Sequence, residues 1–446
     1  MRQDTENILP FASISGKKVE ADFDGGSVSS DGGVLFLREL DSRIGIIQRV
    51  VDCLRDDRHQ SYTLHSVKEM VRQRVFQIAC GYEDANDCND LRFDPAFKVA
   101  CDRLPISGED LSSQPTMSRL ENSVTRTDLY RLASALMDGF LASYPEPPRQ
   151  IVLDMDDTDD PTHGGQQLSL FHGYYDEHCY LPLHIYEGQS GKLITALLRP
   201  GRSLKGKQIV SILKRVVAYI RKAWPQVRIL FRADSHFSTP EVHDWCEDNG
   251  VYYVLGQAGN SKLEEIGGPL LDQARHLHST SGNKVRLFQS FSYQARTWSK
   301  PRRIVFKAEV TPEGANPRFV VTNLQSSQAS FLYDHVYCAR GRVEGFIKNH
   351  KTYLRSDRTS CHKFTANQFR LFLHSVAYIL MHALCEKGLR GTGWAKAQYD
   401  TIQKRILKVG ARVRELSTRV KIHFPTSFPL KDAFNTIITN WASAYP

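Results

Sequence analysis

Apolar and polar residues follow two different periods along this chain, and the two periods predict its helices and strands. Spacings of three and four residues predict amphipathic helices, as from Leu64 to Ile78 and from Leu129 to Phe140. Short apolar runs bounded by polar residues predict strands. We expect strands at 150–156, 179–187, 193–198, 227–233 and 251–256, and helices at 205–223, 239–249 and 365–386.

The order of these elements predicts an α/β core flanked by other units. A Pro-rich stretch at 145–149 is typical of a linker. The interval between the acids Asp234 and Glu344 is long for one compact core, so we expect an insertion there. The predicted units are a mostly helical N-terminal domain, 1–147; a first core part, 148–259; a β-rich insertion, 260–328; a second core part, 329–390; and a basic C-terminal tail, 391–446.

Two of the predicted strands end in acids. One run reads Ile151-Val-Leu-Asp-Met-Asp-Asp-Thr158, and the other leads into Asp234. Side chains in a strand alternate between its faces, so Asp154 and Asp156 share one face. We expect both strand ends to deliver carboxylates to one edge of the sheet.

A third acid lies in a helical pattern further along the chain. Tyr337, Arg340, Glu344 and Lys351 are separated by three, four and seven residues, so a helix would place them on one stripe. An acid flanked by cations suits a phosphate site that also holds a metal ion. The plain alternative is a solvated helix face with an ion pair between Arg340 and Glu344.

Carboxylates from two strand ends and one helix would form a ligand set for hard divalent cations. Mg²⁺ prefers oxygen ligands and keeps several waters, so few carboxylates are needed. Two such ions can clamp the attacking and leaving oxygens of a phosphodiester. Asp156, Asp234 and Glu344 are therefore the candidate ligands.

These motifs resemble those of a large group of DDE transposases from bacterial insertion sequences. Tyr337-x2-Arg340-x3-Glu344-x6-Lys351 matches the Y-R-E-K signature of that group. Arg232-Ala-Asp-Ser-His-Phe237 is similar to its second-acid motif, with His236 where Gly is common. Asp156-Asp-Thr158 is similar to its first-acid motif, so Asp156 is the expected first ligand and Asp154 its substitute. The resemblance covers roughly residues 148 to 385.

The resemblance implies a fold, an activity and partners. It implies an RNase H-like core (a mixed sheet flanked by helices) interrupted by a β-rich insertion, and Mg²⁺-dependent cleavage and strand transfer, with Mn²⁺ as a substitute. The implied partners are double-stranded DNA, namely the terminal inverted repeats and the target, and a second copy of the chain on that DNA. No small-molecule cofactor and no membrane are implied, and the location would be the cytoplasm, at the nucleoid when DNA is bound.

The same resemblance suggests roles for further residues. Tyr337, Arg340 and Lys351 would contact DNA phosphates. In this group the insertion often supplies an aromatic ring that stacks on an unpaired base, and Trp298, among several basic residues, is the candidate. Packing of Trp298 within the insertion is the alternative. The N-terminal domain would bind the transposon ends.

Two other functions fit part of the sequence. Leu153-Asp-Met-Asp-Asp-Thr158 also fits the first motif of haloacid-dehalogenase-type phosphatases, in which Asp154 would be the nucleophile and Asp156 the general acid and base. The later paired-acid motif of that fold is missing around Asp234. A catalytically inactive, DNA-binding transposase relative is the other alternative.

Charge and cysteine usage agree with a nucleic-acid-binding protein of a reducing compartment. The net charge is +9, and residues 340–446 hold 19 Lys and Arg against 6 Asp and Glu. A positive field of this kind favours a polyanionic partner. None of the nine cysteines forms a C-x-x-C pair, which favours reduced thiols over a disulfide framework or a zinc site.

Overall fold

The computed structural model describes residues 8–444, which form two compact units. The first unit combines the described residues of Met1–Ile47, Asp56–Leu120 and Ala383–Pro446. The second contains Gln48–Arg55 and Glu121–His382. This division differs from the predicted one, because the first unit joins segments from both ends of the chain.

The first unit is held together by pairing between distant segments. Strand β16 (Ala411–Glu415) pairs with both β3 (Val28–Ser29) and β17 (Val420–His423). Helix α15 (Lys431–Ala444) packs its buried Trp441 against Phe36, which belongs to α1. The predicted basic tail is therefore part of a folded unit. Its other main elements are β1 (Leu9–Ile14), β2 (Lys17–Ala21), α1 (Val34–Ile44), α3 (Val67–Ala79), α4 (Cys88–Leu91), α5 (Pro95–Ala100) and α14 (Tyr399–Ile402). Helices α2 (Ile46–Val51) and α6 (Gln114–Ser123) cross the boundary between the units.

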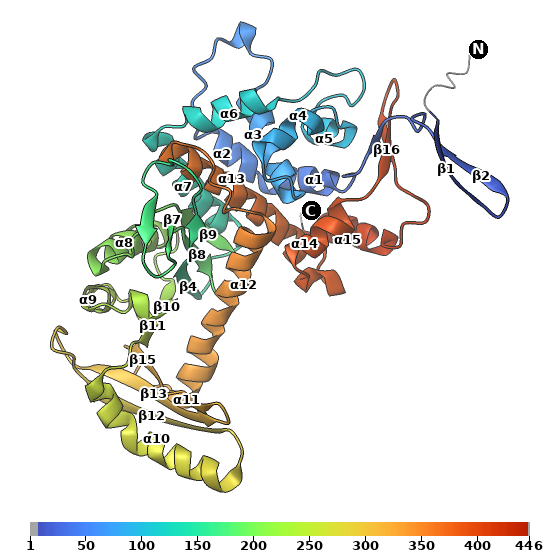
Figure 1. Ribbon diagram of the computed structural model, residues 1–446. Coiled ribbons are helices and arrows are strands. Elements are labelled where there is room, and N and C mark those ends of the chain that lie inside the picture. The colour runs from blue at the N-terminus through green and yellow to red at the C-terminus, as the bar shows by residue number, and fades with distance from the viewer. Residues whose placement is uncertain (1–7, 445–446) are drawn as a thin grey trace, which may run out of the picture. The chain divides into compact units, whose positions relative to one another are not determined.

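The second unit is built on a nine-stranded mixed sheet (Figure 1). At its centre β4, β10 and β11 run parallel, while β8 pairs antiparallel with both β4 and β9. The strand order β9-β8-β4-β10-β11 is that of an RNase H-like sheet, so the predicted fold class is confirmed. The bounds are β4 (Gln150–Asp157), β8 (Leu183–Glu187), β9 (Leu193–Leu197), β10 (Arg228–Ala233) and β11 (Tyr252–Gln257).

The region predicted as an insertion extends this same sheet. Strand β15 pairs antiparallel with β11, β13 pairs with β15, and β12 pairs with β13. One hydrogen-bonded ladder therefore runs from the central strands to the last strand, β12. The added elements are α10 (Ser261–Ser281), β12 (Val285–Tyr293), β13 (Arg302–Thr311), β14 (Gly314–Ala315) and β15 (Arg318–Thr322).

Helices cover both faces of the sheet. On one face, odd-numbered residues of β4, such as Leu153, pack in a core with α7 (Arg126–Ala142), α8 (Gly206–Ala223), α9 (Pro240–Asp248) and α10. On the other face, Val152 packs with Leu332 and Tyr333. Asp154 and Asp156 share the face of Val152, because the side-chain period of a strand is two. A small separate sheet, β5 (Asp160–Pro161), β6 (Leu170–His172) and β7 (Glu177–Tyr180), follows β4.

The segment that carries Glu344 is helical but not uniformly α-helical. Its turns widen to π geometry in η5 (Leu332–Tyr337) and η7 (Asn349–Tyr353), and narrow to 3₁₀ geometry in η6 (Cys338–Gly341). Such local changes rotate the side chains away from an ideal stripe and are common at functional sites. The remaining helices of this part are α11 (Ala329–Phe331), α12 (Arg342–Lys348) and α13 (Phe364–Ala383).

Candidate active site

The first two candidate acids lie at neighbouring strand ends. Asp156 is near the end of β4, and Asp234 directly follows β10. The two strands are parallel, with Asp154 opposite Arg232, so both reach the same edge of the sheet. Asp234 also begins the short helix η4 (Ser235–Phe237), where its Oδ1 accepts a hydrogen bond of 2.9 Å from the backbone N–H of His236. The structure thus brings the two strand ends together.

The guanidinium of Arg340 joins all three candidate acids. Its Nη2 lies 3.1 Å from Oδ2 of Asp156 and 3.8 Å from Oδ2 of Asp234. Its Nη1 lies 3.9 Å from Oε1 of Glu344. The Asp156 side chain is 15% exposed and that of Glu344 is 73% exposed. The helix-borne acid therefore faces solvent above the strand ends, with the cation between them.

Asp156 is a carboxylate in an unfavourable environment. Burial raises its pKa to about 7; Arg340 lowers it, and the nearby acids Asp234, Asp157 and Glu344 raise it. One guanidinium therefore does not fully offset the desolvation and repulsion that Asp156 experiences. A further positive charge at this place would stabilise the ionised form.

The structure places Asp154 outside this cluster. Its side chain is fully buried, and both of its oxygens accept hydrogen bonds from Arg232, at 2.7 and 2.6 Å. Arg232 also donates to the backbone carbonyl of Val336 at 2.8 Å. Burial raises the pKa of Asp154 to about 6, against the opposing effect of Arg232.

The ion pair between Asp154 and Arg232 argues against two of the predicted roles of Asp154. A fully buried carboxylate with both oxygens bonded is not placed to substitute for Asp156 as a metal ligand. Nor is it placed to attack a phosphate ester, as the phosphatase alternative requires. The role of Arg232 was missed in the sequence, although the residue lies two positions before Asp234 within the second-acid motif.

Lys351 lies beside the end of β4. Its Nζ donates to Thr158 Oγ1 at 3.2 Å and to the carbonyl of Asp159 at 2.5 Å, and it pairs with the Asp159 carboxylate at 3.0 Å. Lys351 also lines an open cleft of about 290 Å³ together with Asp156 and Glu344. A cation at the wall of a cleft that holds two of the candidate acids is suitably placed for an anionic ligand.

Tyr337 lies beside Gly256 and the backbone of Ser235, the residue that follows the second acid. A side chain at Gly256 of β11 would place its Cβ 2.6 Å from the Tyr337 hydroxyl and 2.9 Å from the backbone nitrogen of Ser235. Gly256 therefore allows the helical segment to approach the strand that follows the second acid. Burial raises the pKa of Tyr337, so its hydroxyl stays protonated as a hydrogen-bond donor. The periodicity of the sequence held no signal for Gly256.

Trp298 is not at a free surface. It is 7% exposed and packs against His243, with ring centroids 5.1 Å apart, and against Tyr293, at 5.5 Å. The guanidinium of Arg302 lies 5.3 Å from its ring centroid. The structure thus favours the packing role for Trp298, because a ring covered in this way has no face open to a base.

The candidate site has the donor chemistry of a divalent metal site but not its arrangement. Among residues 8–444, no group of three or more His, Cys, Asp or Glu side chains is arranged to hold one. The donor types nevertheless fit a hard cation, since Asp156, Asp234 and Glu344 offer only oxygens. The raised pKa of Asp156 also indicates a local lack of positive charge. The guanidinium of Arg340 lies among these oxygens, so a metal ion would take over contacts that Arg340 now makes.

Comparison with known proteins identifies the family. A family model described as "Transposase DDE domain group 1" matches residues 11–444. The chain belongs to this family. Membership agrees with the three acidic motifs and confirms the predicted resemblance to DDE transposases, while an origin in a bacterial insertion sequence stays a prediction. A search of curated proteins finds no match.

One solved structure that is similar to the chain is a cryo-EM structure of the piggyBac transposase synaptic complex with hairpin DNA. The TM-score is 0.42 with 12% sequence identity, and the match covers 85% of this chain and 80% of that chain.

Within the described part of the chain, no helix is both long and apolar enough to cross a membrane. All nine cysteines lie within the described residues, and none of them is in a disulfide.

Proposed function

We propose that this DDE transposase cleaves DNA at the ends of its own mobile element, an insertion sequence, and transfers the freed strand into target DNA. The observation that carries the proposal is the meeting of Asp156, Asp234 and Glu344 around one guanidinium. Carboxylates from two parallel strand ends and a helix are a ligand set suited to phosphodiester chemistry.

Asp156, Asp234 and Glu344 would hold Mg²⁺, with Mn²⁺ as a substitute. When bound, a pair of such ions supplies activation of the attacking hydroxyl and stabilisation of the leaving oxygen. The protein contributes by fixing its three carboxylates on a rigid sheet edge and on one helix. Arg340 offsets the charge of these acids, which would otherwise repel one another and the DNA backbone.

Two residues around the cleft would position the DNA. Lys351 already donates hydrogen bonds to oxygen atoms on the cleft wall, and a phosphate oxygen could replace Asp159 as its partner. Tyr337 retains its hydroxyl proton and would donate to a second phosphate. These contacts carry no base information, so the choice of DNA ends must lie elsewhere in the protein. Two ends must be joined, which favours a homodimer on DNA.

The proposal is tested by cleavage of DNA that carries the ends flanking the gene, with Mg²⁺ present. Wild type should nick at the ends. Glu344→Gln should lose activity by about 100-fold or more while retaining DNA binding, because a metal ion supplies several kcal/mol of transition-state stabilisation. Glu265→Gln is a matched control, since Glu265 is an exposed acid on α10 that pairs only with Lys262 among the interactions of the described chain.

Three outcomes separate the possibilities. Cleavage by wild type and the control but not by Glu344→Gln supports the proposal and places Glu344 in the site. Equal cleavage by all three would remove Glu344 from it. Binding without cleavage by any of them would point to the inactive, DNA-binding alternative.

A further inference from the structure

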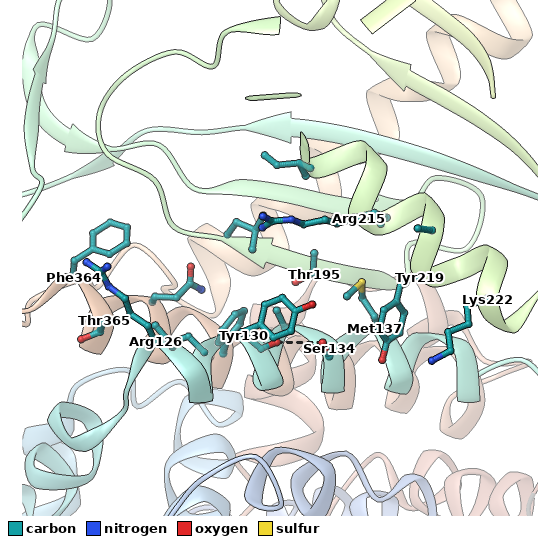
Figure 2. A pocket seen from close by; sticks show the side chains of 18 of the residues that line it. Arg126, Tyr130, Ser134, Met137, Thr195, Arg215, Tyr219, Lys222, Phe364 and Thr365 are labelled. Carbon is teal, nitrogen blue, oxygen red and sulfur yellow. Dashed lines mark hydrogen bonds between the residues drawn. The ribbon is translucent and has the colours of Figure 1, made fainter. Parts of the chain in front are cut away.

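The second unit has a large apolar groove that lies outside the candidate active site. It has a volume of about 690 Å³ and lies among α7, α8, β9 and α13 (Figure 2). Leu129, Met137 and Phe372 are among the apolar residues that line it. A groove of this size and character is typical of a binding site. None of the acids assigned to DNA cleavage contributes to it.

The rim of this groove is basic. Arg126 lies at the start of α7, and Arg215 and Lys222 lie on α8; all three are exposed and line the groove (Figure 2). None of the three has an ion-pair partner among residues 8–444. The nearby Asp138 accepts a hydrogen bond of 2.7 Å from Tyr219. The groove therefore combines an apolar floor with three cations that are free to meet an acidic ligand.

The same chain exposes a hairpin near its N-terminus that has an apolar face and is followed by acidic residues. Strands β1 and β2 form a separate two-stranded sheet, in which Leu9 faces Ala21 and Phe11 faces Val19. One face of this hairpin is thus apolar, although Phe11 is 58% exposed. An isolated two-stranded hairpin is marginally stable in water, so an apolar face of this kind calls for a partner.

Residues 20–24, at the end of the hairpin, match the groove in polarity and charge. Phe23 is 82% exposed and stands between Asp22 and Asp24, with Glu20 at the end of β2. An aromatic ring flanked by three acids is complementary to an apolar floor with three cations.

We propose that the segment Glu20–Asp24 of one copy docks into the groove of a second copy. Phe23 enters the apolar floor, and the acids pair with Arg126, Arg215 and Lys222. Exchange of the two segments between two copies closes a symmetric dimer. This dimer does not require DNA, and the inference does not rest on the proposed cleavage activity.

The first experiment measures the oligomeric state of the full chain without DNA by sedimentation over a range of concentrations. Wild type should dimerise, and Phe23→Ala should raise the dimer dissociation constant by at least about tenfold, as expected for a buried aromatic anchor. Tyr62→Ala is the matched control, because Tyr62 is also an exposed aromatic, 89% exposed, in the first unit. A wild type that stays monomeric at every concentration would overturn the proposal.

A charge exchange tests the partner surface. Arg215→Glu should weaken dimerisation, and adding Asp22→Lys to the same chain should restore it, which a folding defect would not allow. A mixture of Phe23→Ala and Arg215→Glu chains should form heterodimers, since one intact segment then meets one intact groove. Unchanged dimerisation of Arg215→Glu, together with weaker DNA binding, would overturn the proposal and assign the basic rim to DNA.

Discussion

The imidazole rings of His184 and His350 lie within hydrogen-bond distance in the core, with Nε2 and Nδ1 3.2 Å apart. His184 lies on β8 directly opposite Asp156, and His350 follows the helix that bears Glu344. Ser356 and Ser375 complete the contacts of His350, at 2.9 and 3.2 Å. This buried pair ties the helical segment to the sheet behind the acids.

Both rings are held neutral, which makes the stability of the protein sensitive to acid. Burial lowers the pKa of His184 to about 3, and burial also lowers that of His350 well below its usual value. In the unfolded chain each ring takes up a proton near pH 6.5. Their contribution to stability is therefore complete above pH 6.5 and is lost progressively as the pH falls toward 3.

The histidine pair can be tested by urea unfolding at pH 7 and pH 5. His184→Asn removes one of the two titrating rings, so the variant should lose less stability than wild type between these values. His276→Asn, on the exposed face of α10, should leave the difference unchanged. An identical loss in wild type and His184→Asn would contradict the assignment.

The buried pair of Asp154 and Arg232 should behave as a structural unit. Arg232→Met leaves an unpaired buried carboxylate and should cost about 3–5 kcal/mol of stability. The double variant with Asp154→Leu should recover most of that loss, because both charges are then removed. Chemical unfolding of the two single variants and the double variant gives the coupling energy. Additive losses would show that the two side chains act independently.

We expect a bound divalent cation to replace the positive charge that Arg340 places among the three acids. Arg340→Gln removes the charge that offsets the three acids and should lower stability by roughly 1–3 kcal/mol without metal. Added Mg²⁺ should then raise the melting temperature of this variant more than that of wild type. Arg342→Gln, two residues away and exposed, is the control. Equal metal-induced shifts in all three proteins would argue against competition between Arg340 and the ion.

Lys351 should contribute one phosphate contact. Lys351→Ala should weaken binding to the DNA ends and reduce the slope of log affinity against log salt by about one. Lys262→Ala, which removes an exposed cation on α10, is the control. A salt series by fluorescence anisotropy measures both slopes, and a slope unchanged in Lys351→Ala would remove it from the interface.

The periodicity of the sequence predicted the local elements well, because each depends on residues close in the chain. The strands that carry Asp156 and Asp234, and the helix that carries Glu344, were all expected. The buried ion pair of Asp154 was not expected, because a strand period of two gives the face on which a side chain lies but not the residue that it contacts. That partner, Arg232, is set by the register between two strands 78 residues apart.

Contacts between residues that are distant in the sequence were not predicted, because local patterns do not show which segments meet in the fold. The basic residues after 391 suggested a tail, but pairing of β16 with β3 joins residues from opposite ends of the sequence. The sequence left both base stacking and packing open for Trp298, and Arg302 covers its ring in the structure. Local composition does not show which basic side chains fold back on the protein.

The unbroken ladder from β12 to β4 has a mechanical consequence. Because β15 is hydrogen-bonded to β11, and β11 to β10, the outer strands cannot hinge away without breaking main-chain bonds. A load applied to the outer strands is therefore shared along the whole sheet and reaches the strand that ends at Asp234. We therefore expect the outer strands and the strand ends that carry the acids to move together as one rigid body.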